Sequence, residues 1–177
     1  PGFPEKGWVV EGDALKVIAK GGGGDIITKA QYENFELSLE WKVSKGANSG
    51  IMYRVTEEHG APWQTGPEYQ ILDDPAHDVA PTDSITAGGL YALYDNAPEK
   101  VMRPTGEYNH ARIILRDGIV THYLNGVKVV QADLDSQDWA SRVAASKFSG
   151  YEGFGNRPVG HICLQDHGND VWFRNIR

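Results

Sequence analysis

Alternation of hydrophobic and polar residues is the clearest pattern in this chain, and it predicts short β-strands. In residues 35–43, which read FELSLEWKV, every second position is apolar: Phe35, Leu37, Leu39, Trp41 and Val43. Successive side chains of a strand point to opposite faces, so this segment predicts an antiparallel strand with one buried face and one solvated face.

Further short strands are predicted along the whole chain, and only one segment has helical spacing. The predicted strands are residues 8–11, 14–19, 50–55, 68–72, 110–116, 119–124, 127–132, 160–165 and 170–176. Asp117-Gly118 and Asn125-Gly126 favour type I′ hairpin turns, which predicts a meander of three strands. Residues 136–148 predict a short helix, with Ala140, Ala144 and Phe148 on one face and Asp135 or Ser136 as the cap. These elements predict an all-β, two-sheet antiparallel sandwich with one short helix, forming a single domain over residues 1–177.

Composition and charge exclude several classes of partner. The chain has 177 residues, a formal net charge of -7 and no run of Lys or Arg, which argues against nucleic acid and against an anionic membrane surface. No apolar stretch approaches the roughly 20 residues of a membrane span. The lone Cys163 lies in an apolar segment, so we expect a buried, inert thiol.

Two segments suggest a ligand site that their context does not support. The four glycines at 21–24 lack the Gly-Lys-Ser/Thr ending of a phosphate loop and precede no helix, so a flexible surface turn is favoured. The acidic loop 73–83 matches no EF-hand spacing, so a solvated loop is favoured over a calcium site. The segments 56–66, 73–88 and 95–107 are long for loops of a compact sandwich, and long loops on a rigid scaffold often carry binding.

Polar residues inside the apolar strands are the main candidates for chemistry. Glu68 and Gln70 share one face of residues 68–72, which is either a solvated outer face or the floor of a polar site. Strict alternation places Arg54 on the face of Gly50 and Met52, with Asn48 near the start of the strand. Arg54 is then either an ordinary surface charge or a donor to sugar hydroxyls or a developing oxyanion.

Candidates also occur near the end of the chain and in the loops. Gln165 and His167 lie on one side of residues 163–170 and Asp166 on the other; a histidine here is either a general acid or base, or a structural residue. The aromatic residues near the loops are either sugar-stacking platforms or core and rim residues: Trp63, Tyr91, Tyr94 and Tyr151. No local pair of carboxylates suits an ordinary two-carboxylate glycosidase, although partners from other strands remain open.

Several motifs in order along the chain resemble the bacterial 3-keto-disaccharide hydrolase family, formerly a domain of unknown function. They are GWVVEGDALKV, GGGGDIITKAQYENFELSLEWKV, NSGIMYRV, PWQTGPEYQILDD, YNHARIIL, THYLNGVKVV, ASKF and GHICLQDHGNDVWFRNIR. The resemblance implies a concanavalin A-like jelly roll of the lectin/glucanase type, with a sugar site on the concave face, in an exported protein of the periplasm or the extracellular space. Family members normally carry more sequence at both ends, so we expect this chain to be trimmed.

The resemblance also implies a substrate class and a set of site residues. A ketone at C3 of a sugar acidifies the C2 hydrogen, so a base can form an enolate that expels the C1 aglycone; water addition completes net hydrolysis. This route needs a base, an oxyanion stabiliser and an acid. We therefore expect Glu68, His167 and Arg54 to be catalytic, with Glu68 or His167 as the base and Arg54 or a metal at the enolate oxygen. The predicted substrate-binding residues are Asn48, Gln70, Trp63, Tyr91, Tyr94, Lys147, Gln165 and Asp166.

Two other functions stay open from the sequence. A non-catalytic carbohydrate-binding module would use the same fold, and a structural or adhesion domain would bind no sugar there. The expected partner is an oligosaccharide or a glycoside. No cofactor is required by the residues, although the chemistry would accommodate a divalent metal, and the sequence gives no indication of oligomeric state.

Overall fold

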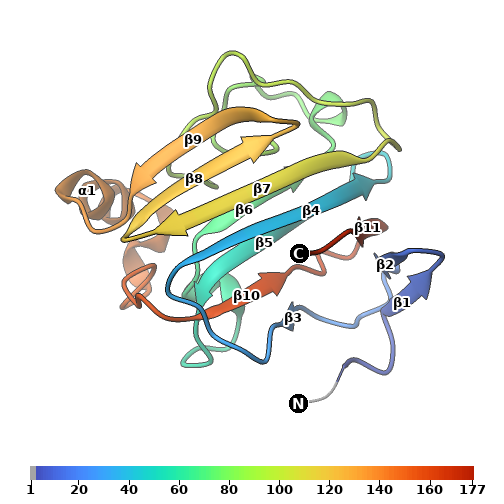
Figure 1. The fold of residues 1–177 in the computed structure, drawn as a ribbon, viewed down its shortest axis with the longest axis horizontal. Helices are drawn as coiled ribbons and strands as arrows, with labels where there is room; N and C mark the ends of the chain where they lie inside the picture. Colours follow the sequence, from blue (N-terminus) through green and yellow to red (C-terminus); the bar gives the residue numbers. More distant parts are fainter. Residues whose placement is uncertain (1–2) are drawn as a thin grey trace.

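Two antiparallel β-sheets pack face to face in the computed structural model, which describes residues 3–177 (Figure 1). The larger sheet has the strand order β1-β2-β11-β4-β7-β8-β9. Its strands are β1 (Trp8–Glu11), β2 (Ala14–Val17), β11 (Val171–Arg174), β4 (Phe35–Val43), β7 (Asn109–Arg116), β8 (Ile119–Leu124) and β9 (Val127–Asp133). The smaller sheet has the order β3-β10-β5-β6, with β3 (Ile26–Ile27), β10 (His161–Leu164), β5 (Asn48–Val55) and β6 (Glu68–Leu72).

The core lies between the two sheets, as the alternation predicts. Leu39 and Trp41 of β4 are fully buried on the inner face of the larger sheet. Ile51 of β5, with Tyr69 and Ile71 of β6, belongs to the same buried cluster from the opposite side. The inner positions of β6 are therefore 69 and 71, which turns Glu68 and Gln70 to the outer face of the smaller sheet.

The predicted meander is confirmed. β7 pairs with β8, and β8 with β9, all antiparallel. Positive φ angles occur at both residues of each turn, 50° and 79° at Asp117-Gly118 and 49° and 84° at Asn125-Gly126. Type I′ turns need this geometry, and Asn, Asp and Gly adopt it at the lowest cost.

The helix is shorter than predicted and buries a different face. α1 (Gln137–Ala145) is capped at its N-terminus by Ser136, whose hydroxyl oxygen accepts the Trp139 N–H. Trp139 is buried, whereas Ala140 and Ala144 are exposed, so the predicted alanine face is wrong. The chain continues as a 3-10 turn, η3 (Lys147–Gly150); two others are η1 (Pro62–Gln64) and η2 (Asp74–Ala76).

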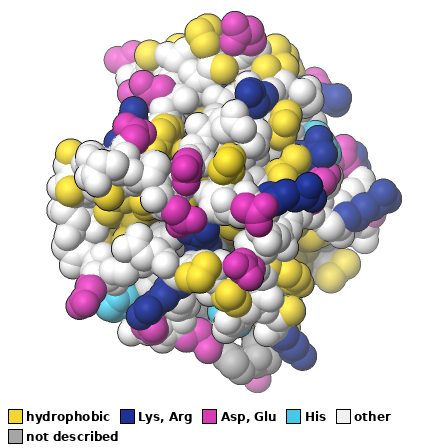
Figure 2. Space-filling view, turned by 60° about the vertical axis from the view of Figure 1, so that its left-hand side comes forward, with side chains coloured by type: hydrophobic (Ala, Val, Ile, Leu, Met, Phe, Trp, Pro, Cys, Tyr) yellow, Lys and Arg dark blue, Asp and Glu magenta, His cyan; other side chains and the backbone are white. Residues whose placement is uncertain are grey.

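Charged side chains are spread over the surface. Figure 2 views the end of the sandwich nearer α1 and shows acidic and basic side chains interspersed among uncharged ones. Across residues 3–177, no helix has the length and apolar character needed to cross a membrane.

Candidate active site

Glu68 and Gln70 form the floor of a cavity on the outer face of the smaller sheet. The strand register places Glu68 beside Met52 and Gln70 beside Gly50. Glu68 is 9% exposed and Gln70 is 2% exposed. Of the two interpretations left open by the sequence, a solvated outer face is therefore wrong for this part of β6.

The cavity has a volume of about 200 Å³, with a buried floor and an exposed mouth. Its lining residues come from β5, β6, the turn after β10, and three loops: Asn48, Trp63, Glu68, Gln70, Tyr91, Lys147, Phe148, Gln165 and His167. Lys147 and His167 are exposed at the mouth. A hollow of about 340 Å³ elsewhere in the molecule is lined mainly by aliphatic side chains such as Leu37 and Ile162, so it lacks comparable chemistry.

The electrostatic environment of Glu68 is unusual for a carboxyl group. Burial raises the pKa of Glu68 to about 8, because desolvation disfavours the charged form. The positive charge of Lys147 lowers this pKa, and the negative charge of Asp25 raises it. A carboxyl group with such a pKa can exchange a proton near neutral pH, as general acid–base catalysis requires.

Gly50 leaves the space that the Glu68 carboxyl group occupies. A Cβ atom at position 50 would overlap the Glu68 side chain. The neighbouring strand of the sheet therefore has no side chain at the centre of the cavity floor, and the carboxyl group lies over the backbone of β5.

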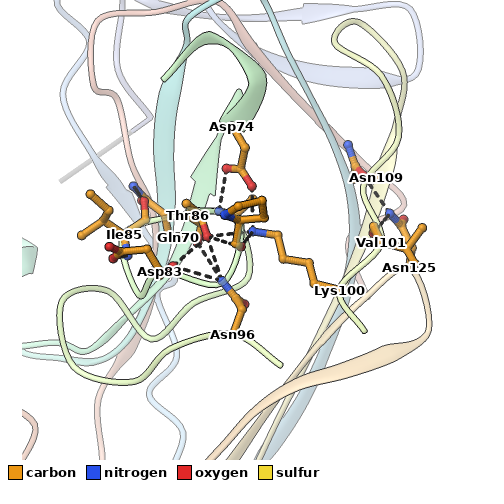
Figure 3. A network of polar contacts seen from close by, with 12 residues as sticks. Gln70, Asp74, Asp83, Ile85, Thr86, Asn96, Lys100, Val101, Asn109 and Asn125 are labelled. Atoms are coloured by element: carbon orange, nitrogen blue, oxygen red, sulfur yellow. Dashed lines mark hydrogen bonds and ion pairs between the residues drawn. The ribbon is translucent and has the colours of Figure 1, made fainter. Parts of the chain in front are cut away.

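Three amide oxygens beside this carboxyl group are buried and have no partner within residues 3–177. They are Asn48 Oδ1, Gln70 Oε1 and Gln165 Oε1. Gln70 is held by its other end, because its Nε2 donates to the Ile85 carbonyl at 3.0 Å (Figure 3). Buried acceptors without donors are rare in folded proteins, and hydroxyl groups of a bound molecule would satisfy them.

Aromatic and basic side chains form the walls. Lys147 Nζ lies 4.2 Å from the ring centroid of Tyr91 and 5.2 Å from that of Phe148. Trp63 packs edge-on against Tyr151, with 5.2 Å between the ring centroids. Lys147 is thus a cation held at the mouth of the cavity, near enough to act on the Glu68 charge.

Arg54 lies outside this cavity, because the alternation of β5 breaks at its end. Arg54 has a φ angle of 54°, and the register between β10 and β5 shifts between His161 and Cys163. Val55 consequently packs in the same small cluster as Met52. The Arg54 guanidinium donates to the Gly155 carbonyl at 3.0 Å and approaches Asp135 at 3.4 Å, so the predicted location of Arg54 beside Met52 is wrong.

Tyr94 and Asp166 also lie away from the cavity lining. The Tyr94 hydroxyl donates to Asp138 at 2.7 Å, and its ring stacks on Trp139. The Asp166 carboxylate accepts the backbone N–H groups of Gly23 and Gly24. The structure therefore brings together eight of the predicted residues: Glu68, His167, Asn48, Gln70, Trp63, Tyr91, Lys147 and Gln165.

Asp25 is a residue that the sequence interpretation missed. It lies directly before β3, and its charge acts on Glu68 from across the sheet. Burial raises the pKa of Asp25 itself. The signal in the sequence was an acidic residue between the four glycines and the apolar pair Ile26 and Ile27.

Within residues 3–177, no group of three or more His, Cys, Asp or Glu side chains is arranged to hold a metal ion. The divalent metal considered from the sequence stays a prediction.

Residues 2–177 match the 3-keto-alpha-glucoside-1,2-lyase-like domain family. The chain belongs to this family. A 3-keto-disaccharide hydrolase of Bacteroides thetaiotaomicron is 36% identical over 199 residues, which covers 96% of this chain and 69% of that protein. The match spans the strands and the loops of the cavity, so the family assignment includes the site and not the scaffold alone.

Solved structures agree with the fold. A candidate glycosyl hydrolase from Parabacteroides distasonis superposes with a TM-score of 0.85 at 34% identity, covering 97% of this chain and 82% of that one. A family 66 carbohydrate-binding module from Bacillus subtilis has a TM-score of 0.60 at 14% identity, covering 97% of this chain and 90% of that one. The second likeness concerns the fold alone. The predicted jelly-roll class is confirmed.

Proposed function

We propose that this chain cleaves the glycosidic bond of 3-keto sugars in the cavity above Glu68, with net hydrolysis as the outcome. The observation that carries the proposal is the single buried carboxyl group with a pKa of about 8, next to a cation and three unpartnered amide oxygens. The family and its named relative supply the substrate class.

Proton abstraction is the first step of the proposed mechanism. The Glu68 carboxylate removes the proton at C2 of the sugar, and the electron pair of the broken C–H bond forms the enolate of the C3 ketone. A base with a pKa near neutral is stronger than an ordinary carboxylate, which suits the removal of a proton from carbon. The Lys147 ammonium group stabilises the negative enolate oxygen, the role predicted from the sequence for Arg54 or a metal.

Loss of the aglycone is the second step. The enolate reforms the C3 carbonyl, a double bond forms between C1 and C2, and the bond from C1 to the aglycone oxygen breaks. His167, at the mouth of the cavity, donates a proton to that oxygen. Water then adds hydroxyl at C1 and hydrogen at C2, which completes the hydrolysis.

Substrate recognition falls to the amide oxygens and the aromatic wall. Asn48, Gln70 and Gln165 accept hydrogen bonds from sugar hydroxyls, because their oxygens are buried and unpartnered. Trp63 contributes an apolar surface for the C–H groups of the ring. We also propose that this cavity is on the concave face of the sandwich and that the protein acts outside the cytoplasm.

The test uses a pair of matched substrates, an aryl 3-keto-glucoside and the same glucoside without the ketone. Wild-type protein should release the phenol from the keto substrate only, and exchange the C2 hydrogen for deuterium in D₂O. Glu68→Gln should lower kcat by about 10²–10⁴-fold with little change in KM. The plot of kcat/KM should rise with pH through about 8, because the base acts in its ionised form.

Three results would contradict parts of the proposal. Release from both substrates would exclude the ketone-dependent route. Activity that falls as pH rises through 8 would make Glu68 the acid instead of the base. Sugar binding with neither product nor exchange would identify a carbohydrate-binding module, the alternative that the fold allows.

A further inference from the structure

His167 is carried by a short turn between β10 and β11 whose neighbouring side chains point in different directions. Gln165 and His167 both line the cavity. Asp166, between them, lies away from it and accepts the Gly168 N–H at 2.9 Å. Gln165 and His167 of this turn thus face the cavity, whereas the Asp166 side chain hydrogen-bonds to the backbone.

Asp166 also forms hydrogen bonds with a segment more than 140 positions earlier in the chain. Asp166 Oδ2 accepts the N–H of Gly23 at 3.1 Å and that of Gly24 at 3.0 Å. Asp25 Oδ1 accepts the Asp166 N–H at 2.8 Å, so bonds run in both directions. We call the hydrogen bonds among Gly23, Gly24, Asp25 and Asp166 the Asp25–Asp166 bridge.

The glycine segment 21–24 is the fixed partner in this bridge. A Cβ atom at Gly23 would lie 2.6 Å from the Lys6 carbonyl oxygen and 2.6 Å from the Trp8 ring, so only glycine fits there. Trp8 Nε1 donates to the Gly24 carbonyl at 2.7 Å. The predicted surface position is confirmed, because Gly22 and Gly24 are exposed. The turn is also closely packed at Gly23, and its glycines present backbone N–H groups to a carboxylate.

β5 holds the other side of the turn. Gln165 N donates to the Gly50 carbonyl at 3.0 Å, and Asn48 N donates to the Asn169 side chain at 3.1 Å. The turn is therefore fixed from the substrate side by β5 and from the opposite side by the glycine segment. The His167 side chain, although exposed, extends from a backbone with little freedom.

We propose that Asp25 and Asp166 are positioning residues, which place the His167 imidazole over the cavity through the Asp25–Asp166 bridge. The inference rests on the proposed function, in which His167 donates the proton to the leaving aglycone. Carboxylates that accept backbone N–H groups make strong, directional hydrogen bonds. A displacement of about 1 Å at a reacting group can cost about 10²-fold in rate.

Asp25 also acts on Glu68 through its charge. The negative charge of Asp25 raises the pKa of Glu68, and the charge of Asp166 contributes to the raised pKa of Asp25. The Asp25–Asp166 bridge therefore affects both proposed acid–base residues. It holds the backbone that carries His167, and the charge of Asp25 raises the pKa of Glu68.

The test compares Asp166→Asn with Asp170→Asn. Asp170 is a matched control, since its Oδ1 accepts the Ala19 N–H at 2.8 Å and thus links the same two parts of the chain at the far end of the turn, three positions from His167. We expect Asp166→Asn to lower kcat about 10²-fold with KM little changed. The NMR signals of the His167 ring should shift and broaden in Asp166→Asn and stay at their wild-type positions in Asp170→Asn.

Asp25→Ala provides a second, milder variant that removes one acceptor. If Asp166→Asn does not fold, the kcat and the His167 ring signals of Asp25→Ala decide the question. Equal effects of Asp166→Asn and Asp170→Asn on kcat would overturn the proposal. An Asp166→Asn variant with lowered stability but unchanged His167 ring signals and kcat would also overturn it. So would a His167→Ala variant with the kcat of the wild type. If the wild-type protein cleaves no 3-keto glycoside, the proposed function fails, and the ring signals alone then decide whether the bridge positions His167.

Discussion

Glu68 shows how one residue can lower stability for the sake of chemistry. In the folded protein the pKa of Glu68 is about 8, whereas the pKa of a solvated glutamate is 4.5. Between these values the folded state binds more protons than the unfolded state, so stability falls as pH rises, by at most about 1.4 kcal/mol per pH unit. The stabilisation of the folded state by the protonated Glu68 is fully present below pH 4.5 and is lost above about pH 8.

Glu68→Gln should therefore be more stable than the wild type at high pH. The amide has no proton to lose, so the difference in free energy of unfolding should grow from pH 4.5 to about 8 and then level off. Urea denaturation at a series of pH values measures this difference, with the exposed Glu99→Gln as a control for the change from carboxyl to amide at the surface. A difference for Glu68→Gln that does not change with pH would mean that the Glu68 carboxyl group is solvated.

At the scale of elements, the loop over β6 depends on a buried ion pair. Lys100 Nζ lies 2.6 Å from Asp74 Oδ2, and the two side chains are only 4% and 13% exposed (Figure 3). Lys100 also donates to Thr86 Oγ1 at 2.8 Å, and Asn96 donates to the same hydroxyl oxygen at 3.0 Å. This network holds the loop segment that pairs with β6 and carries Tyr91 to the cavity.

Lys100→Met should destabilise the protein by about 3–5 kcal/mol, because Asp74 is left buried and unpaired. Adding Asp74→Asn should restore part of this loss, since the charge is removed while the amide oxygen can still accept the Ala87 N–H. Denaturation of both single variants and the double variant gives the coupling energy. The exposed pair Arg157–Glu58 is the control, and Arg157→Met should have a much smaller effect. Equal losses for both lysine and arginine variants would contradict the role of burial.

Alternation predicts strand faces until the backbone leaves ordinary strand geometry. It gives the faces of β4 and β6 correctly, because neither strand contains a residue with a positive φ angle. It fails at Arg54, where a positive φ angle moves the side chain to another face, and such an angle in a non-glycine residue leaves no trace in the pattern. The buried ion pair in the acidic loop was missed for a related reason, since Lys100 is 26 positions beyond Asp74.

At the scale of the molecule, the alternation of apolar and polar residues does not predict which distant strands pair with one another. The hairpins β7-β8-β9 follow from local turn residues, but the placement of β10 and β11 between early strands depends on contacts across most of the chain. Motif resemblance supplied six of the nine residues that line the cavity, and the clustering of aromatic residues near the loops supplied Trp63 and Tyr91. Phe148 was named from the sequence only as a helix position. The Asp25–Asp166 bridge joins two such motifs, and its pairing could not be inferred from either one alone.

The net charge of -7 should make the rate depend on the charge of the aglycone. Association with an anionic substrate is slowed by the field of the protein, and salt screens that field within about 10 Å at 0.1 M. The value of kcat/KM for a 4-carboxyphenyl 3-keto-glucoside should rise with added salt, whereas the 4-carboxamidophenyl analogue should show little change. Stopped-flow or steady-state assays over a salt series measure this. A fall for the carboxylate would mean that Lys147 dominates the local field.

The insertion of the last two strands also has a consequence for synthesis on the ribosome. β11 lies between β2 and β4, and β10 lies between β3 and β5, so each sheet has a gap until its inserted strand has been made (Figure 1). A nascent chain that ends before His161 carries unpaired strand edges in the middle of both sheets, and one that ends between Leu164 and Val171 still carries them in the larger sheet. Neither sheet can be completed before its inserted strand has been made, and until then the open strand edges are exposed to incorrect pairing.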